Sequence, residues 1–305
     1  MVSKIPSNHN LSYSRHELGD QKEKTLVQLP IVSVIMPAYN AERTLVEAIE
    51  SLLAQDFRDF ELIVVDDGSS DGTATILERY ARTDARIVIL TNALNQGISR
   101  SRNRALEVAR GEYVACLDSD DVAEPSRLGT QLEFMNKNPA YVLLGSDLTI
   151  IDEASAIVGR RVYPHTDHEL RKAMPRLNPF AQPASMFRAE LSRKIGGFRE
   201  DLPLCEDYDF FFRLAEHGKV SNLAQPLTRY RVSSTQTKTT RLQETVRYTL
   251  LVQQWAFERG WKQSASDMIY RLMLRSLLLF PHKVVLRLFK WSTYRLVRSS
   301  MTSSA

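Results

Sequence analysis

Aspartate residues cluster where an apolar run ends. The run YVACL leads directly into Asp118, Asp120 and Asp121, within residues 113–122. Three carboxylates this close repel one another unless they face water or share a cation. Hard divalent cations such as Mg²⁺ and Mn²⁺ prefer oxygen ligands and also bind phosphate oxygens. The pattern indicates a metal site for a phosphate-bearing ligand, with a solvated loop or a helix cap as the alternative.

Three more short apolar runs end in polar residues. They are IVSVIM at 31–36, ELIVV at 61–65 and RIVIL at 86–90, and helical spacing follows them at 45–55, 73–82 and 98–110. Alternating strands and helices predict an α/β fold with a mostly parallel, Rossmann-like sheet and helices on both faces. Ligands bind beyond the carboxyl ends of such strands. The polar segments that follow the four strands are Pro37-Ala38-Tyr39-Asn40, Asp66-Asp67-Gly68-Ser69, Asn92 with Asn95, and Asp118-Ser119-Asp120-Asp121.

Several common cofactor motifs are absent. No GxGxxG follows the first strand and no GxxxxGK[ST] occurs, which argues against a dinucleotide site and a P-loop. Cys116 and Cys205 form no CxxC pair, so zinc and redox motifs are also absent. Asn40 has the residue type and position of an N-cap for the first helix. The acidic edge is therefore the strongest chemical signal in the first half of the chain.

Residues 123–240 are less periodic. They contain Gly196-Gly197 and Glu206-Asp207, and the latter opens an apolar helical stretch. The two glycines fit either a turn or a place where a second substrate approaches the backbone. Acidic residues in a first helical turn also stabilise the helix dipole without any role in catalysis. We expect this region to form a second half-layer that closes over the acidic edge.

The two ends of the chain differ in charge. Residues 1–28 are polar, without the apolar core of a signal peptide, and predict a flexible leader. No uncharged apolar stretch of about 18 residues occurs in the chain, so we expect no membrane span. From Arg271 to Arg298 there are seven Lys or Arg residues, no acid and many leucines. This basic tail either packs within the protein or lies on an anionic membrane surface.

Long stretches of the chain resemble family 2 glycosyltransferases of GT-A fold. The stretches are VSVIMPAYNAERTLVEAIESLLAQDFRDFELIVVDDGSSDGT, NQGISRSRNRAL, GEYVACLDSDD, NPFAQPASMFR, GGFRE, EDYDFFFRLAEHG and LTRYRV. They occur in order over roughly 200 residues, up to about Val232. The resemblance implies a glycosyltransferase domain at 29–238. The polar leader at 1–28 and the helical basic extension at 239–305, which are expected from composition and pattern, lie outside the resemblance. Within the domain, 29–122 would bind the nucleotide sugar and 123–238 the acceptor.

The resemblance also implies roles for individual residues. Asp207 would be the catalytic base, and Asp120 with Asp121 would hold Mn²⁺ or Mg²⁺ on the diphosphate. Asp67 would hydrogen-bond the base of the nucleotide and Asp118 would contact the ribose. The other residues implied in nucleotide binding are Pro37, Ala38, Tyr39, Asn40, Asp66, Gly97, Arg100, Arg102 and Ser119. The implied acceptor-binding residues are Gly196, Gly197 and Glu206.

The required chemistry agrees with these residue types. A departing diphosphate needs charge neutralisation, which a divalent cation supplies. An attacking hydroxyl group needs an ionised carboxylate as its base. Arg100 and Arg102, at the start of the third helix, would add positive charge near the phosphates.

The chain departs from the family pattern at two points. Ser233 stands where members often have a histidine that ligates the metal, so the third protein ligand is open. Gln182 replaces another frequent histidine before the MFR segment. The QxxRW motif of processive polymer synthases is absent, which favours addition of a single sugar.

The predicted function is an inverting transfer of one sugar, most simply from a UDP-linked donor, to an acceptor hydroxyl group. A cell-surface polysaccharide or a lipid-linked glycan would be the product. The alternatives are a metal-dependent nucleotidyltransferase, which would release pyrophosphate, and a catalytically silent nucleotide-sugar-binding protein. We expect no nucleic-acid partner, because the basic region is leucine-rich and lacks a recognised nucleic-acid-binding motif. The expected location is cytoplasmic, at the inner face of the cell membrane if the basic tail binds lipid.

Overall fold

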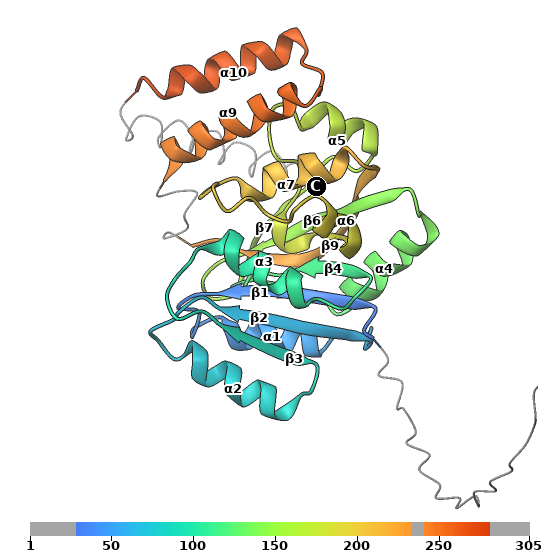
Figure 1. The fold of residues 1–305 in the computed structure, drawn as a ribbon, viewed down its shortest axis with the longest axis vertical. Coiled ribbons are helices and arrows are strands. Elements are labelled where there is room, and N and C mark those ends of the chain that lie inside the picture. Colours follow the sequence, from blue (N-terminus) through green and yellow to red (C-terminus); the bar gives the residue numbers. More distant parts are fainter. Residues whose placement is uncertain (1–28, 234–240, 281–305) are drawn as a thin grey trace, which may run out of the picture.

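The first half of the chain alternates strands and helices as predicted (Figure 1). The computed structural model describes residues 29–233 and 241–280, so the expected leader lies outside the described residues. The observed elements begin and end within one or two residues of the predicted ones. They are β1 (Val32–Ala38), α1 (Leu45–Leu53), β2 (Phe60–Asp66), α2 (Thr73–Thr83), β3 (Ile87–Thr91), α3 (Ile98–Val108) and β4 (Tyr113–Cys116).

The second half adds strands to the same sheet. Its elements are β5 (Val122–Ala123), α4 (Arg127–Lys137), β6 (Tyr141–Ile151), β7 (Ile157–Arg161), α5 (Asp167–Ala173), the 3₁₀ turn η1 (Gln182–Ala184), β8 (Met186–Arg188), α6 (Ala189–Lys194), α7 (Glu206–Ala215) and β9 (Lys219–Arg231). Within the described residues the strand order is β3-β2-β1-β4-β8-β6-β9-β5, and β7 pairs with β6.

The sheet is mixed, with two parallel groups joined by one antiparallel strand. Strands β1 to β4 are parallel, as are β6 and β9. Strand β8 lies antiparallel between β4 and β6. The structure differs here from the expected half-layer, because β8 pairs with β4 and continues the sheet. The proposed boundary between residues 122 and 123 falls inside β5, so both halves share one scaffold.

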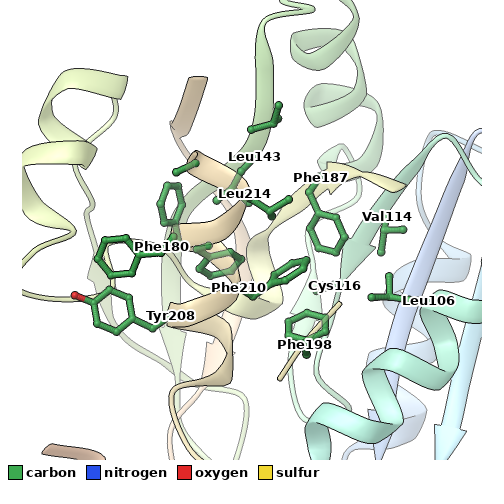
Figure 2. Packing of buried hydrophobic residues seen from close by; sticks show 14 of the residues in the cluster. Leu106, Val114, Cys116, Leu143, Phe180, Phe187, Phe198, Tyr208, Phe210 and Leu214 are labelled. Atoms are coloured by element: carbon green, nitrogen blue, oxygen red, sulfur yellow. The ribbon is translucent and has the colours of Figure 1, made fainter. Parts of the chain in front are cut away.

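Two apolar cores lie on opposite faces of the sheet. Side chains alternate along β2, so Leu62 and Val64 join one core while Ile63 and Val65 join the other. The first core includes α1, α2 and α4, and the second includes α3, α6 and α7. Figure 2 shows the second core, where the Phe210 ring of α7 stacks on Phe198 with centroids 4.1 Å apart. This packing anchors the first turn of α7, which carries Glu206 and Asp207.

Two further helices lie beyond α7 in Figure 1. They are α9 (Leu242–Glu258) and α10 (Ala265–Leu277). Val252 and Ala256 of α9 are fully buried in the core that contains α7. Helix α10 lies outermost, and Asp267 joins it to Arg176 through a 2.6 Å ion pair. Among the described helices, none combines the length and the apolar character needed to cross a bilayer.

Candidate active site

The carboxylate of Asp67 ties the loop after β3 to the end of β2. Its Oδ1 accepts hydrogen bonds from Asn92 Nδ2 at 2.6 Å and from the backbone N–H of Gln96 at 2.9 Å. Its Oδ2 accepts from the backbone N–H of Gly97 at 2.9 Å. Asp67 is therefore buried, and both of its carboxylate oxygens accept hydrogen bonds within the protein. A contact with a nucleotide base would use the remaining lone pairs of this carboxylate.

The neighbouring segments form a second set of turns. Asp66 Oδ1 accepts from the backbone N–H of Ser69 at 3.0 Å, which closes the turn after β2. The prediction that Asn40 caps the first helix is wrong, because that helix begins four residues later, after Thr44. Asn40 instead adopts a left-handed conformation with φ 48°, and its Oδ1 accepts from the backbone N–H of Ser70 at 2.9 Å.

Those turns bring the ends of β1 and β2 together. The carbonyl group of Ala38 accepts from the backbone N–H of Asp67 at 2.8 Å. Pro37 and Ala38 are part of β1, whereas the Tyr39 side chain is half exposed at the strand end. The PAYN segment and the Asp66-Asp67 segment therefore line one edge of the sheet, as predicted.

The acidic loop after β4 is fastened to two other elements. The carbonyl group of Ser119 accepts from Thr44 Oγ1 at 2.9 Å, next to α1. The carbonyl group of Asp120 accepts from Arg231 Nε at 2.8 Å, and Asp121 Oδ1 accepts from the backbone N–H of Arg231 at 2.8 Å. Asp121 is fully buried, and its Oδ2 has no hydrogen-bond partner.

The electrostatics of this loop favour a bound cation. Burial and the charge of Asp118 raise the pKa of Asp120 to about 6. Burial and the charges of Asp120 and Asp118 raise the pKa of Asp121 well above its ordinary value. A divalent cation beside these carboxylates would stabilise their ionised forms. The buried, unpartnered Oδ2 of Asp121 is an oxygen ligand of the required type.

The protein supplies only part of a complete coordination shell. Within residues 29–233 and 241–280, no group of three or more His, Cys, Asp or Glu side chains has the arrangement to hold a metal ion. Mg²⁺ commonly binds through one or two carboxylates plus phosphate oxygens of the substrate. Asp120 and Asp121 would fit that mode if phosphate oxygens of a ligand completed the coordination.

Arg231 holds the acidic loop in place, and sequence reasoning missed it. Besides its contacts with Asp120 and Asp121, it reaches Glu47 Oε2 at 2.6 Å and Ser155 Oγ at 3.0 Å. Its side chain is almost fully buried. One sequence signal could have identified this residue: an arginine among the apolar residues of the last strand. Arginine is almost never fully buried without partners.

A buried arginine links the acidic loop to α7. Arg102 is 2% exposed and bonds Asp118 Oδ1 at 2.9 Å and Glu206 Oε1 at 2.6 Å. We expected Arg102 to face the phosphates, but both of its terminal nitrogens contact these carboxylates. Asp207, the next residue after Glu206, accepts from Asn178 Nδ2 through its Oδ2 at 3.0 Å. The expected base is thus positioned relative to the acidic loop.

The remaining expected residues have mainly structural contacts. Arg100 forms an ion pair with Glu200 at 3.2 Å, and both side chains are largely exposed. These two residues and Gly97, which caps α3, line a cavity of about 410 Å³. Gly196 and Gly197 have positive φ and end α6, with the Gly197 N–H bonded to the Ser192 carbonyl at 2.9 Å. The turn interpretation therefore accounts for both glycines.

Two departures from the family pattern can also be located. Gln182 is buried in η1, where its Nε2 lies 3.3 Å from Cys116 Sγ and its Oε1 has no partner. Ser233 is the last described residue before residues 234–240, which lie outside the description.

Comparison with known proteins adds independent findings. A sequence model of glycosyl transferase family 2 matches residues 33–196. The putative glycosyltransferase EpsE of Bacillus subtilis is 36% identical over 245 residues, which is 79% of this chain and 86% of that protein. The Escherichia coli protein named UDP-Glc:alpha-D-GlcNAc-diphosphoundecaprenol beta-1,3-glucosyltransferase WfgD is 42% identical over 134 residues, covering 44% of this chain and 51% of WfgD.

A solved structure agrees with the fold. The mannosyltransferase PcManGT from Pyrobaculum calidifontis, in complex with GDP-Man and Mn²⁺, superposes with a TM-score of 0.59. The match covers 92% of this chain and 77% of PcManGT, at 18% identity. At that identity the likeness concerns the fold, and it confirms the predicted GT-A architecture.

Proposed function

Because the chain belongs to glycosyltransferase family 2, we propose that it moves a single sugar from a nucleotide diphosphate sugar to an acceptor hydroxyl group, with inversion at the anomeric carbon. The arrangement that carries this proposal is the bridge from Asp118 through Arg102 to Glu206. It fixes the acidic loop relative to Asp207, as in-line displacement requires. We favour a UDP-linked donor, since the name of WfgD states one.

In this proposal, one set of residues stabilises the leaving group and another activates the nucleophile. Asp120 and Asp121 would hold Mn²⁺ or Mg²⁺, whose charge offsets that of the departing diphosphate. Asp67 and the PAYN segment would bind the nucleoside. Asp207, held by Asn178, takes the proton from the acceptor hydroxyl group. That oxygen then bonds to the anomeric carbon as the bond to the diphosphate breaks.

The donor test uses purified protein with UDP-glucose, UDP-N-acetylglucosamine and GDP-mannose, each with Mn²⁺ or Mg²⁺. We expect one nucleotide sugar to raise the melting temperature and to release nucleoside diphosphate. Asp120→Ala should abolish the metal-dependent shift, whereas the control Asp84→Ala, at the end of α2, should retain it. If none of the nucleotides stabilises the protein with metal present, the acidic edge is not a donor site.

The catalytic test uses Asp207→Asn, which keeps the size of the side chain. Removing a general base lowers turnover by about 10²- to 10⁴-fold. Donor binding should stay unchanged, because Asp207 does not contact the nucleotide in this proposal. Unchanged turnover would exclude Asp207 as the base.

The products of the unchanged chain separate the alternatives. Release of pyrophosphate instead of nucleoside diphosphate would support the nucleotidyltransferase alternative, and binding without any turnover would support the silent binding protein.

The proposed acceptor is a lipid-linked glycan at the cytoplasmic face of the cell membrane. The diphosphoundecaprenol-linked acceptor in the name of WfgD supports this class. On α10 and just after it, large apolar side chains are exposed; they are Met268, Ile269, Leu272, Met273, Leu279 and Phe280. An anionic bilayer would cover this face and attract the basic tail.

The first basic residue of the tail, Arg271, packs against α9. The Arg271 guanidinium lies over the Phe257 ring of α9, 4.9 Å from its centroid. Of the seven basic residues, the five from Lys283 onward lie outside the described residues. The proposed membrane contact at 268–298 therefore rests on the apolar face of α10 together with the charge of the sequence that follows it.

The full-length chain should sediment with vesicles of phosphatidylcholine and phosphatidylglycerol, but not with phosphatidylcholine alone. Changing Leu272→Glu together with Met273→Glu should abolish binding, because charged residues would then face the lipid. A matched control is Leu94→Glu, which alters an exposed leucine far from α10. Equal binding by the double variant and the unchanged chain would exclude this face.

A further inference from the structure

A small third cluster of apolar residues lies apart from the two cores. It contains Leu148, Tyr163, Ala181 and Ala184, with Ile150 and Tyr230 packed against it. The cluster joins β6, η1 and β9 through their side chains. Neither tyrosine was assigned a role by the sequence.

Strand geometry shows which face of the sheet the cluster occupies. Side chains alternate along β9, and Arg231 reaches Glu47 of α1. Tyr230 therefore points to the opposite face, where η1 lies. Tyr230 pairs with Ile150 of β6, and β5 flanks β9 on its other side. Because β5 directly follows the acidic loop, Tyr230 stands beside that loop.

Tyr163 is 7% exposed, and its hydroxyl group is not among the fully buried atoms of the described residues that lack a hydrogen-bond partner, so this group reaches the solvent. The other two buried tyrosines are satisfied: Tyr113 donates to Asn136 Oδ1 and Tyr208 to the Met174 carbonyl group. Buried tyrosine hydroxyl groups usually find a partner. The Tyr163 hydroxyl group is therefore open to a ligand or to water, while the backbone N–H of Tyr163 donates to Asp147 Oδ1 at 3.1 Å.

Both tyrosines lie in the electric field of the expected site residues. Burial raises the pKa of Tyr230, and the carboxylates of Asp121, Asp118 and Asp120 add to the shift. Burial also raises the pKa of Tyr163, where nearby Arg161 opposes the shift and the charge of Asp207 adds to it. Tyr230 is thus close to the acidic loop, Tyr163 is influenced by Asp207, and the two rings belong to one cluster.

We propose that Tyr163 and Tyr230 form the wall that contacts the transferred sugar of the donor. This inference rests on the proposed function. In-line displacement requires the sugar to lie between the diphosphate, at the acidic loop, and the base Asp207. Tyr230 borders the acidic loop, and Tyr163 packs with Ala181, three residues after the Asn178 that bonds Asp207. Both side chains offer ring faces for the apolar side of a sugar and hydroxyl groups for its polar edge.

The test compares a nucleotide sugar with the nucleoside diphosphate it contains. Dissociation constants for UDP-N-acetylglucosamine and UDP, or for the donor that the nucleotide panel selects, are measured with Mn²⁺ by calorimetry. Tyr163→Phe and Tyr230→Phe should each weaken binding of the nucleotide sugar about three- to tenfold, the effect of one lost hydrogen bond. Binding of the nucleoside diphosphate should not change, because it lacks the sugar.

Tyr141→Phe is the matched control. Tyr141 starts β6 at the far end from the cluster and packs against Phe134. Its variant should leave both dissociation constants unchanged. A merely structural role for Tyr163 or Tyr230 would change the dissociation constants of the nucleotide sugar and the nucleoside diphosphate by the same factor. That result overturns the assignment, as does a variant in which the ratio of the two constants stays the same as in the unchanged chain. If the unchanged chain binds no nucleotide at all, the proposed function fails first and this assignment with it.

Discussion

At the scale of single residues, the carboxylate of Asp207 is held by one side-chain donor and one backbone donor. Asn178 bonds one carboxylate oxygen of Asp207, and the backbone N–H of Tyr208 bonds the other. Asn178→Ala should leave the carboxylate held only by the Tyr208 N–H, so we expect turnover to fall about tenfold because catalytic alignment is partly lost. Donor affinity should not change. The readout is steady-state kinetics, with Asn138→Ala at the end of α4 as control.

Asn178→Asp gives a second readout of the same contact. A second carboxylate beside Asp207 disfavours the ionised form of the base. The rising limb of the pH–rate profile should therefore move to higher pH in this variant, and activity should recover at alkaline pH. A profile that merely scales down at every pH would mean that Asn178 does not act through Asp207.

The link between Asp118, Arg102 and Glu206 could not be read from the sequence. The residue types at these positions were recognised, but Arg102 and Glu206 are 104 positions apart. Only the packing of α3 against the start of α7 brings them together. A buried guanidinium is retained where carboxylates satisfy it, since burial of an unpaired charge is costly. The sequence thus predicted the charged groups, and the fold decides which of them neutralise one another.

At the scale of the elements, Arg231 fastens the acidic loop to the end of β9. Arg231→Met removes contacts with Asp120, Glu47 and Ser155, so we expect a loss of about 2–3 kcal/mol in the free energy of unfolding. Metal-dependent donor binding should weaken as well, because the loop is no longer held. Urea unfolding and the donor thermal shift measure the two effects.

Arg229→Met is the control for this prediction. Arg229 lies two residues earlier on the same face of β9, and its ion pair with Glu124 is partly exposed. Such pairs contribute at most about 1 kcal/mol, so this variant should bind the donor normally. If both variants lose the same stability and neither loses donor affinity, Arg231 does not hold the acidic loop for donor binding.

The parallel half of the sheet was predictable because its signals are local. Apolar runs, helical spacing and polar strand ends all lie within about ten residues of one another. The second half was harder to predict: β5 has two residues and β8 has three, too few for periodicity to show. Their pairing with distant strands produces the continuous sheet. Because these two short strands could not be recognised in the sequence, a separate half-layer was expected instead.

At the scale of the whole molecule, the helical extension divides into two parts with different roles. Val252 and Ala256 of α9 are buried in the core of α7, and Phe212 of α7 packs edge-on against Trp261. Helix α10 presents an exposed apolar face and joins the body through the pair of Asp267 and Arg176. We therefore expect α9 to belong to the folding unit of the enzyme and α10 to be dispensable for folding.

Two truncations separate these roles. A chain that ends at Lys262 keeps α9 and Trp261, so it should fold and hydrolyse the donor like the full chain, but it should no longer bind anionic vesicles. A chain that ends at residue 238 uncovers the apolar side of α7. Burial of one large apolar side chain contributes about 1.5–3 kcal/mol, so the loss of several should exceed the stability of most domains. Circular dichroism and vesicle sedimentation of the two chains give the answer. If the chain that ends at 238 folds and turns over the donor, the catalytic domain ends at 238 and α9 belongs to the extension. If the chain that ends at Lys262 still binds vesicles, the lipid-binding face lies elsewhere than α10 and the residues after it.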